Sequence, residues 1–151
     1  MTVNNLSTAL DLALKSRIGL IGFVVHGWED ARAYVKAGAE LKVPVVLQAG
    51  PACRKHTPIP VLAKMFRSLA EKTKCNVVLH LDHATDFETC HAALNEGFTS
   101  VMFDGSKLEL EENIKQTSRV CKLAESYNAS VEAEIGFVGY EDQSNNKPTI
   151  P

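Results

Sequence analysis

Apolar and polar positions follow two patterns along the chain. The first pattern is a short apolar run bounded by polar or turn residues, which occurs at 18–25, 44–48, 77–82, 100–104 and 130–135. Such runs are typical of strands that are buried on both faces of a sheet. The sequence therefore predicts five buried strands. The third ends abruptly in a carboxylate and an imidazole.

The second pattern places apolar residues three or four positions apart, as on one face of a helix. It precedes the first strand and follows each of the first four, which predicts helices over 5–15, 28–41, 57–72, 85–97 and 106–127. Thr57 before Pro58 is a favourable helix start, and capping boxes begin at Thr85 and Ser106. Gly97 has the position that glycine usually takes after a helix.

Strand and helix alternate five times without a hairpin signal, which predicts an α/β fold with a parallel sheet. A (β/α)8 barrel and an open doubly wound sheet both satisfy this order. No Gly-x-Gly-x-x-Gly follows the first strand, which weakens the dinucleotide-binding version of the open sheet. No Gly-Lys-Ser/Thr follows any strand, which excludes a P-loop.

Composition narrows the function classes. The chain has 151 residues, 45% of them hydrophobic, and a net charge of -2, as expected for one globular domain or part of a larger one. The charge balance favours neither nucleic acid nor an anionic membrane as partner. No apolar stretch approaches a bilayer span, and the N-terminus lacks a secretion signal. The four cysteines form no CxxC pair, which favours free thiols in a reducing cytoplasm.

Candidate chemistry lies at the carboxyl ends of the predicted strands, where the loops of parallel α/β folds converge. The polar residues at these ends are His26, Gln48, Asp82, His83, Asp104, Glu132 and Glu134. An unpaired buried charge costs several kcal/mol. Carboxylates from three successive strands therefore require a positive partner, and a divalent metal is the simplest one.

Structural roles compete with this interpretation. Asp104 could cap a helix or form a turn, and His80, inside its strand, is more typical of a hydrogen-bonded core histidine. Glu132 and Glu134 share one face of their strand, where a lysine elsewhere in a barrel could neutralise them. His83 lies at the start of a loop, where neutral imidazole can bind a metal, although catalytic zinc usually has three protein ligands.

Four motifs in order resemble the zinc-dependent class II aldolases, that is, the fructose- and tagatose-bisphosphate aldolases and their relatives. The motifs lie at 80–83, 97–106, 111–114 and 131–136. The resemblance covers the whole chain and is densest over 77–142. It implies a (β/α)8 TIM barrel, commonly a homodimer, in which residues 1–151 are the N-terminal portion with about the first five strands. It also implies a cytoplasmic enzyme of carbohydrate metabolism such as glycolysis.

The resemblance implies roles for individual residues. Asp82 resembles the catalytic acid/base of C3–C4 cleavage, which yields glycerone phosphate and an aldehyde from a ketose bisphosphate. His83 resembles the first of three histidine ligands of a catalytic zinc, and Asp104 and Glu134 resemble ligands of a second or alternative cation position. Glu141 resembles the glutamate of a mobile active-site loop, here 137–151, that enolises the ketone phosphate.

Two positions depart from the family pattern. Val24 and Gly50 stand where the family usually has hydrogen-bonding residues near the substrate, which leaves Gln48 and His26 as the polar candidates for substrate binding at these strand ends. The departures put a hexose bisphosphate substrate in doubt. They keep open another metal-dependent barrel lyase or isomerase, or a truncated non-catalytic paralogue.

A complete barrel takes about 250 residues. If the polypeptide ended at Pro151, five strands could not close it, and the two further zinc histidines would be absent. In that case we expect no aldolase activity and poor solubility of the chain alone.

Overall fold

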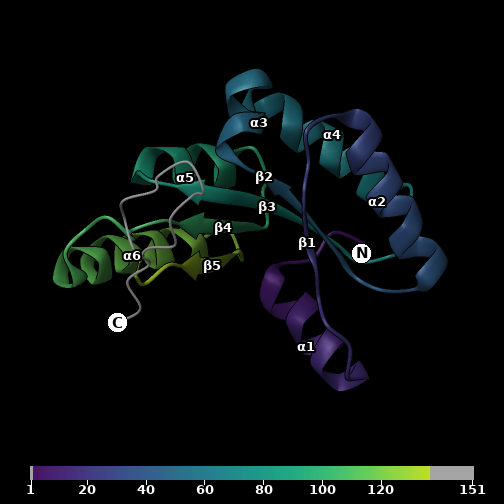
Figure 1. The fold of residues 1–151 in the computed structure, drawn as a ribbon, viewed down its shortest axis with the longest axis horizontal. Helices are drawn as coiled ribbons and strands as arrows, with labels where there is room; N and C mark the ends of the chain where they lie inside the picture. Colours follow the sequence, from purple (N-terminus) through teal and green to yellow (C-terminus); the bar gives the residue numbers. More distant parts are fainter. Residues whose placement is uncertain (1, 137–151) are drawn as a thin grey trace, which may run out of the picture.

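The computed structural model describes residues 2–136, in which five parallel strands form one sheet. The strands are β1 (Gly22–Val24), β2 (Val45–Ala49), β3 (Val77–Ala84), β4 (Ser100–Phe103) and β5 (Ser130–Ala133). They pair in the order β1-β2-β3-β4-β5 (Figure 1). A doubly wound sheet reverses its strand order at a switch point, whereas a barrel keeps it sequential. The sequential order therefore favours the barrel.

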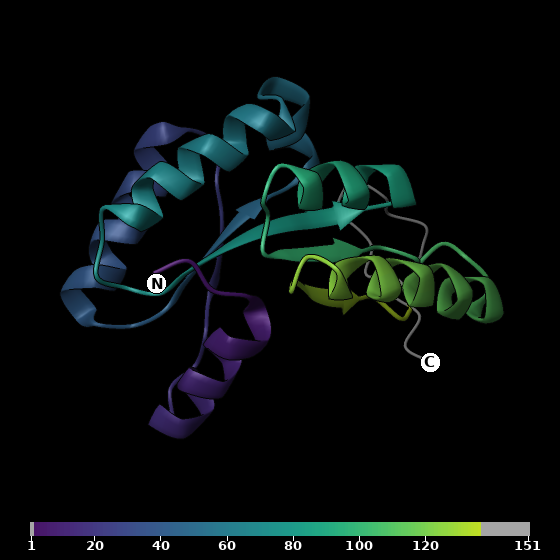
Figure 2. The same cartoon turned by 180° about the vertical axis from the view of Figure 1, so that it is seen from behind.

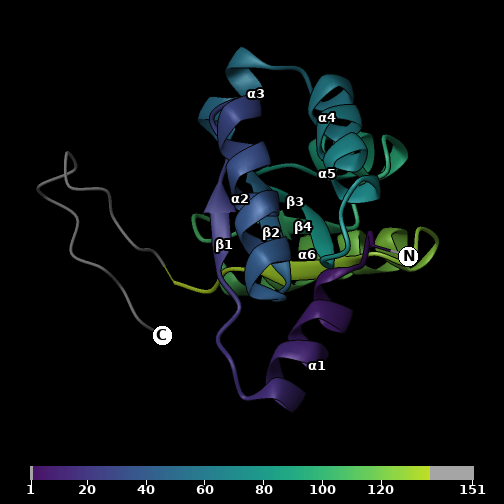
Figure 3. The same cartoon turned by 90° about the vertical axis from the view of Figure 1, so that its right-hand side faces the viewer.

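The described helices are α1 (Leu6–Ser16), α2 (Trp28–Leu41), α3 (Pro51–His56), α4 (Ile59–Glu71), α5 (Phe87–Asn95) and α6 (Leu110–Glu125). In Figures 1 and 2, α2, α4, α5 and α6 follow the outer face of the curved sheet. In Figure 3, α1 lies on the side of the sheet away from α3 and α4. Within residues 2–136, none of these helices combines the length and apolar character needed to cross a bilayer.

The outer face of the sheet carries the main hydrophobic core. Leu47, Leu79 and Val101 point outward from successive strands and pack against helix residues such as Phe66 and Leu94, all nearly inaccessible to solvent. Side chains alternate between the two faces of a strand. The intervening residues of β2, β3, β4 and β5 therefore define an inner face, which is concave in the barrel.

The inner face changes from apolar to polar along the strands. At the amino ends, Val46 and Val78 pack against Ala9 of α1. The hydroxyl of Ser7, also in α1, lies 3.0 Å from that of Ser130. Helix α1 thus covers the amino-terminal part of the inner face, and the carboxyl-terminal part remains available for polar residues.

The first strand is shorter than predicted. The apolar run 18–25 gives a strand only over Gly22–Val24, and Ile18, Ile21 and Val24 are exposed by 40%, 62% and 44%. The prediction of a strand buried on both faces is wrong here because, among the described residues, β1 pairs with β2 alone and forms an edge of the sheet.

Helix α3 was not predicted, because Gly50-Pro51 indicates a break. Pro51 instead occupies the first turn of α3, with Gly50 as N-cap; proline suits that position since its missing N–H would have no helical partner. Thr57 is consequently the C-cap of α3 rather than an N-cap, and Pro58 precedes α4.

Two capping predictions are also wrong. Asp86, not Thr85, caps α5, and its carboxylate accepts a hydrogen bond from the backbone N–H of Thr89 at 2.7 Å. Ser106 does not begin a helix: its N–H and hydroxyl both donate to Asp104, and α6 begins four residues later. A short polar side chain has several local backbone partners, and the sequence does not select among them.

Gly38 of α2 offers a test of the packing between α2 and β2. A Cβ at this position would lie 2.2 Å from Val45 Cγ2 and 3.2 Å from the carbonyl of Val43. Gly38→Ala should therefore lower the free energy of unfolding by about 1–3 kcal/mol, although alanine is the better helix former. Urea denaturation measures this. Gly19→Ala is the control, since no atom lies within 4 Å of its added Cβ; an equal loss in both variants would contradict the packing.

Candidate active site

A β-bulge at the end of β3 brings two consecutive residues to the site. Leu81 pairs with Val101 and Ala84 with Phe103, so β3 advances three residues where β4 advances two. The extra residue interrupts the alternation of faces. His83 has φ 49°, in the left-handed region that few non-glycine residues adopt. Asp82 and His83, which would face opposite sides in a regular strand, both contact residues of the inner face.

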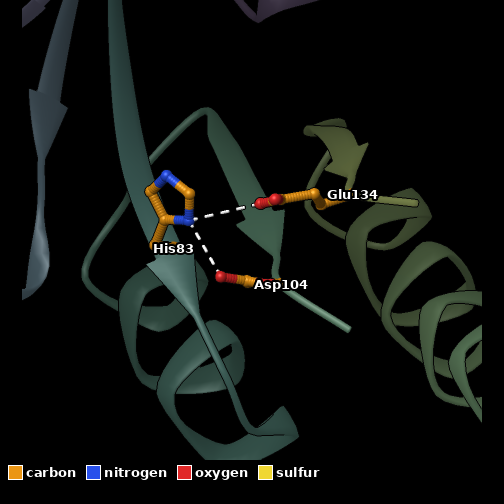
Figure 4. Close-up of side chains that lie close together, drawn as sticks. All are labelled: His83, Asp104 and Glu134. Carbon is orange, nitrogen blue, oxygen red and sulfur yellow. Dashed lines mark hydrogen bonds and ion pairs between the residues drawn. The ribbon is translucent and has the colours of Figure 1, made fainter. Parts of the chain in front are cut away.

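His83 contacts two carboxylates that directly follow the next two strands. Its Nδ1 lies 2.9 Å from Asp104 Oδ2 and 3.5 Å from Glu134 Oε2 (Figure 4). One ligand atom from each of the three residues lies within 4.8 Å of the other two. The structure thus brings together the three residues predicted to bind metal. Asp104 also has the predicted turn role, because its Oδ1 accepts from Ser106 while its Oδ2 faces His83.

Asp82 is buried, with 8% of its surface exposed, and points along the inner face. Gln48 Nε2 donates to Asp82 Oδ1 at 3.3 Å, so the predicted substrate-binding glutamine contacts the predicted acid/base. His80 Nε2 lies 3.8 Å from the same oxygen. A cavity of about 400 Å³ on this face is lined in part by Gln48, His80 and Glu132.

His80 is fully buried, as expected for a core histidine. Its Nδ1 lies 2.8 Å from Ser100 Oγ, which confirms the predicted hydrogen bond. Its Nε2 has no hydrogen-bond partner among the described residues and lies 3.5 Å from Glu132 Oε2. Burial and the nearby His83 lower the pKa of His80 to about 4, so the ring is neutral near pH 7. Two carboxylates beside Nε2 favour the tautomer with the proton there, and the Ser100 hydroxyl then donates to Nδ1.

The pKa values of the carboxyl groups diverge. Burial raises the pKa of Asp82, with a further contribution from Asp104, and outweighs the opposing effects of His83 and Arg54. Burial also raises the pKa of Glu134, again with help from Asp104. The pKa of Asp104 is lowered instead, because hydrogen bonds from Ser106 and His83 outweigh its burial. Asp104 therefore ionises more readily than Asp82 and Glu134, which hold a proton more readily.

The charge of His83 responds to the same neighbours. Burial lowers its pKa, but the hydrogen bond to Asp104 and the charges of Asp82, Asp104 and Glu134 outweigh that effect and raise the pKa overall. In the absence of a metal, a proton on Nδ1 is therefore stabilised by the carboxylates, and a bound cation would have to displace it.

The donor set fits a divalent metal. Imidazole and carboxylate groups are ordinary ligands of zinc and of several other divalent ions. Glu134 Oε2 is buried and makes no hydrogen bond within residues 2–136; it faces His83 Nδ1 at 3.5 Å, and a cation bound between the two groups would compensate its charge. Asn113 of α6 donates to the Glu134 carbonyl at 2.8 Å and fixes the backbone of this residue.

Two predicted site residues do not join this cluster. His26 is exposed and follows β1, and its backbone N–H donates to Asp30. Among the described residues, its side chain takes no part in the hydrogen bonds and ion pairs that join the other candidates. Glu141, with the predicted mobile loop 137–151, lies outside the described residues.

Sequence reasoning placed Asn113 in a family motif without assigning it a role, and it missed Arg54. The guanidinium of Arg54 donates to backbone carbonyls at the site. Both lie on helices, and Asn113 contacts Glu134 across 21 residues of sequence while Arg54 contacts Asp82 and His83 across 28 and 29. The proline at the start of α3 could have indicated the helix that carries Arg54.

Comparisons with known proteins all indicate the same family. Residues 4–150 match the sequence model of the class II fructose-bisphosphate aldolases. A fructose-bisphosphate aldolase of Helicobacter pylori (strain J99) is 40% identical over 132 residues, which are 86% of this chain and 43% of that protein. A fructose-bisphosphate aldolase of Geobacillus stearothermophilus is 35% identical over 94% of this chain and 50% of its own length. The chain thus spans half the length of these relatives or less.

Solved structures agree with the fold. The YdjI aldolase from Escherichia coli K12 superposes with a TM-score of 0.82 and 28% sequence identity, over 89% of this chain and 52% of that one. The five sequential strands and their helices are those of one part of a class II aldolase TIM barrel, which confirms the predicted architecture.

The buried His80 predicts a pH-dependent stability. An unfolded histidine titrates near pH 6.5 and this one at about 4. Between these values the unfolded chain binds the proton more readily, so stability falls as pH falls. The protein should lose about 2 kcal/mol of unfolding free energy through His80 between pH 7 and pH 5.

Urea denaturation of the protein and of His80→Gln at pH 7, 6 and 5 isolates this contribution. Glutamine retains a partner for Ser100 but does not titrate. The variant should lose less stability on acidification, and an identical pH dependence in the two proteins would show that His80 is not the group responsible.

Proposed function

Since this chain belongs to the class II fructose-bisphosphate aldolase family, we propose that it carries part of an aldolase active site. The reaction is the reversible cleavage of a ketose bisphosphate into glycerone phosphate and an aldehyde. The observation that carries the proposal is the pairing at the β3 bulge. There, a buried carboxyl group, Asp82, directly precedes a histidine that shares a cluster with Asp104 and Glu134.

Asp82 is proposed as the acid/base. Cleavage requires a group that removes the proton from the C4 hydroxyl, and condensation requires the same group to return it. Burial raises the pKa of Asp82 and so brings its proton affinity closer to that needed near neutral pH. Gln48 donates to one carboxylate oxygen at 3.3 Å, which orients the group while the other oxygen remains for the substrate.

His83 is proposed as a ligand of a catalytic zinc, and Asp104 and Glu134 as ligands of a second or alternative cation position beside it. Support comes from the proximity of their ligand atoms, all within 4.8 Å, and from the buried Glu134 Oε2, which makes no hydrogen bond within residues 2–136. When bound, such a cation would act as a Lewis acid that polarises the substrate carbonyl. Glu141 is proposed as the base that removes the proton from the ketone phosphate.

The substrate is proposed to be a phosphorylated ketose, and two positions near the acid/base bear on its identity. At Gly50, an added Cβ would lie 3.5 Å from Asp82 Oδ2, so a side chain here would stand beside the acid/base. Glycine leaves that space open and offers no hydroxyl, and Val24 contributes none at the end of β1. These features favour, as a second candidate, a metal-dependent lyase or isomerase of the same fold acting on a different sugar or keto acid.

We also propose that the protein acts in the cytoplasm and as a homodimer. The cytoplasmic location is supported by the cysteines, because a reducing compartment keeps thiols free. All four are free thiols: Cys53, Cys75, Cys90 and Cys121. The proposed homodimer rests on the chain's membership of a family that is commonly dimeric.

Substitution of Asp82 tests the proposed acid/base role. Asp82→Asn should lower kcat for fructose or tagatose bisphosphate by about 10²–10⁴-fold, while the metal content per chain stays unchanged. Asp86→Asn is the control, because Asp86 only caps α5 and asparagine is an equally good cap.

The measurements are a coupled assay for glycerone phosphate and metal analysis of the same preparations. Full turnover by Asp82→Asn would remove Asp82 from the mechanism. A metal-loaded protein that cleaves neither bisphosphate would instead favour the altered substrate or a non-catalytic role.

A further inference from the structure

We infer that Arg54 is a positioning residue of the site, whose guanidinium holds the β3 bulge in the conformation that presents Asp82 and His83 together. The contacts of Arg54 exist independently of any activity. Its consequence for metal binding and turnover rests on the function proposed above.

Arg54 reaches three backbone carbonyls from two strands. Its Nη1 donates to the carbonyl of Ala49, at the end of β2, at 2.6 Å, and to that of Asp82. Its Nη2 donates to the carbonyl of His83 at 3.1 Å. One planar group therefore binds both residues of the bulge and ties them to the neighbouring strand.

The bulge is the part of β3 where such donors matter most. A bulge interrupts the regular ladder and leaves the extra residue without an ordinary strand partner. The left-handed backbone of His83 adds a conformational cost, and such a conformation persists only where its surroundings over-determine it. The hydrogen bonds from Arg54 to the carbonyls of both bulge residues stabilise this backbone conformation.

The chemistry of the side chain suits this role. Guanidinium presents several N–H groups in a rigid plane, so it can bind adjacent carbonyls at fixed separation, whereas an ammonium group cannot reproduce the fork. The positive charge of Arg54 also acts on Asp82, where it lowers the pKa and so opposes the effect of burial. Arg54 thus contributes positive charge to the site without occupying the position between His83, Asp104 and Glu134.

The position of Arg54 is set by the helix that sequence patterns did not reveal. Helix α3 begins at Pro51, directly after β2. From this helix, the Arg54 guanidinium donates back to the carbonyl of Ala49, the last residue of β2. The short connection leaves little freedom in where the guanidinium can reach. The β2–α3 turn and the β3 bulge therefore form one unit.

A matched arginine is available as a control. Arg67 of α4 is half-buried, like Arg54, and its Nη2 donates to the carbonyl of Gly97 at 2.7 Å. Gly97 also has a positive φ, 91°. This contact, however, lies before β4, at the amino end of the sheet. Arg67→Met removes the same kind of interaction as Arg54→Met, at the end of the sheet remote from the site.

The experiment is a titration with Co²⁺, followed by its visible absorption, of the protein and of Arg54→Met, Arg54→Lys and Arg67→Met. Loss of groups that orient metal ligands typically weakens metal affinity about 10–100-fold. Arg54→Met should show a loss of this size and Arg54→Lys a smaller one, while Arg67→Met keeps the original affinity. Unchanged Co²⁺ affinity in Arg54→Met would overturn the inference.

Amide hydrogen exchange supplies a readout that requires no metal. The N–H of Asp104 donates to the carbonyl of Ala84, directly after the bulge, at 2.7 Å. This N–H should exchange faster in Arg54→Met but not in Arg67→Met. If the unsubstituted protein binds no Co²⁺, the proposed metal site fails while the exchange comparison still decides the role of Arg54; equal exchange in both variants would refute it. Should Arg54→Met not fold, Arg54→Lys decides by the same two criteria.

Discussion

A strand in regular register turns consecutive side chains to opposite faces. Asp82 and His83 are consecutive, yet one contacts Gln48 on the inner face and the other contacts Asp104 and Glu134. The bulge in β3 resolves this conflict by inserting one residue opposite Met102 of β4. Proton transfer and metal binding, as proposed, both depend on that local irregularity, since a regular strand would direct one of the two side chains into the outer hydrophobic core.

The inner face explains how so many acidic groups can coexist. Ionised carboxylates from β3, β4 and β5 repel one another, and burial adds a desolvation cost. The carboxyl groups differ in how readily they ionise. Asp104 receives hydrogen bonds that keep it ionised, whereas burial raises the pKa of Asp82, Glu132 and Glu134. Such a site is destabilising for the metal-free protein, and a bound cation would relieve the repulsion. The acidic inner face thus supports the cation site proposed above.

Sequence patterns predicted the strands and most of the candidate site because these depend on local information, whereas the choice of a barrel over a doubly wound sheet came from the family resemblance. Buried parallel strands are continuous apolar runs, and polar residues at their carboxyl ends are visible without coordinates. The failures have a common cause in interactions that the local pattern does not encode. Within residues 2–136, β1 pairs on one side only, which leaves Ile21 exposed. Arg54 reaches the carbonyls of Asp82 and His83, which are 28 and 29 residues away in sequence. The bulge itself leaves no signal, since Asp82-His83 would read identically in a regular strand.

Metal localisation tests the central claim, that the bulge presents His83 to a cation beside a free Asp82. Anomalous diffraction from crystals of the zinc-loaded protein locates the ion directly. The account predicts a zinc peak in contact with His83 and with Asp104 or Glu134, and an Asp82 carboxylate that does not ligate it. A zinc ion bound elsewhere, or coordinated by Asp82 with His83 turned away, would contradict the account.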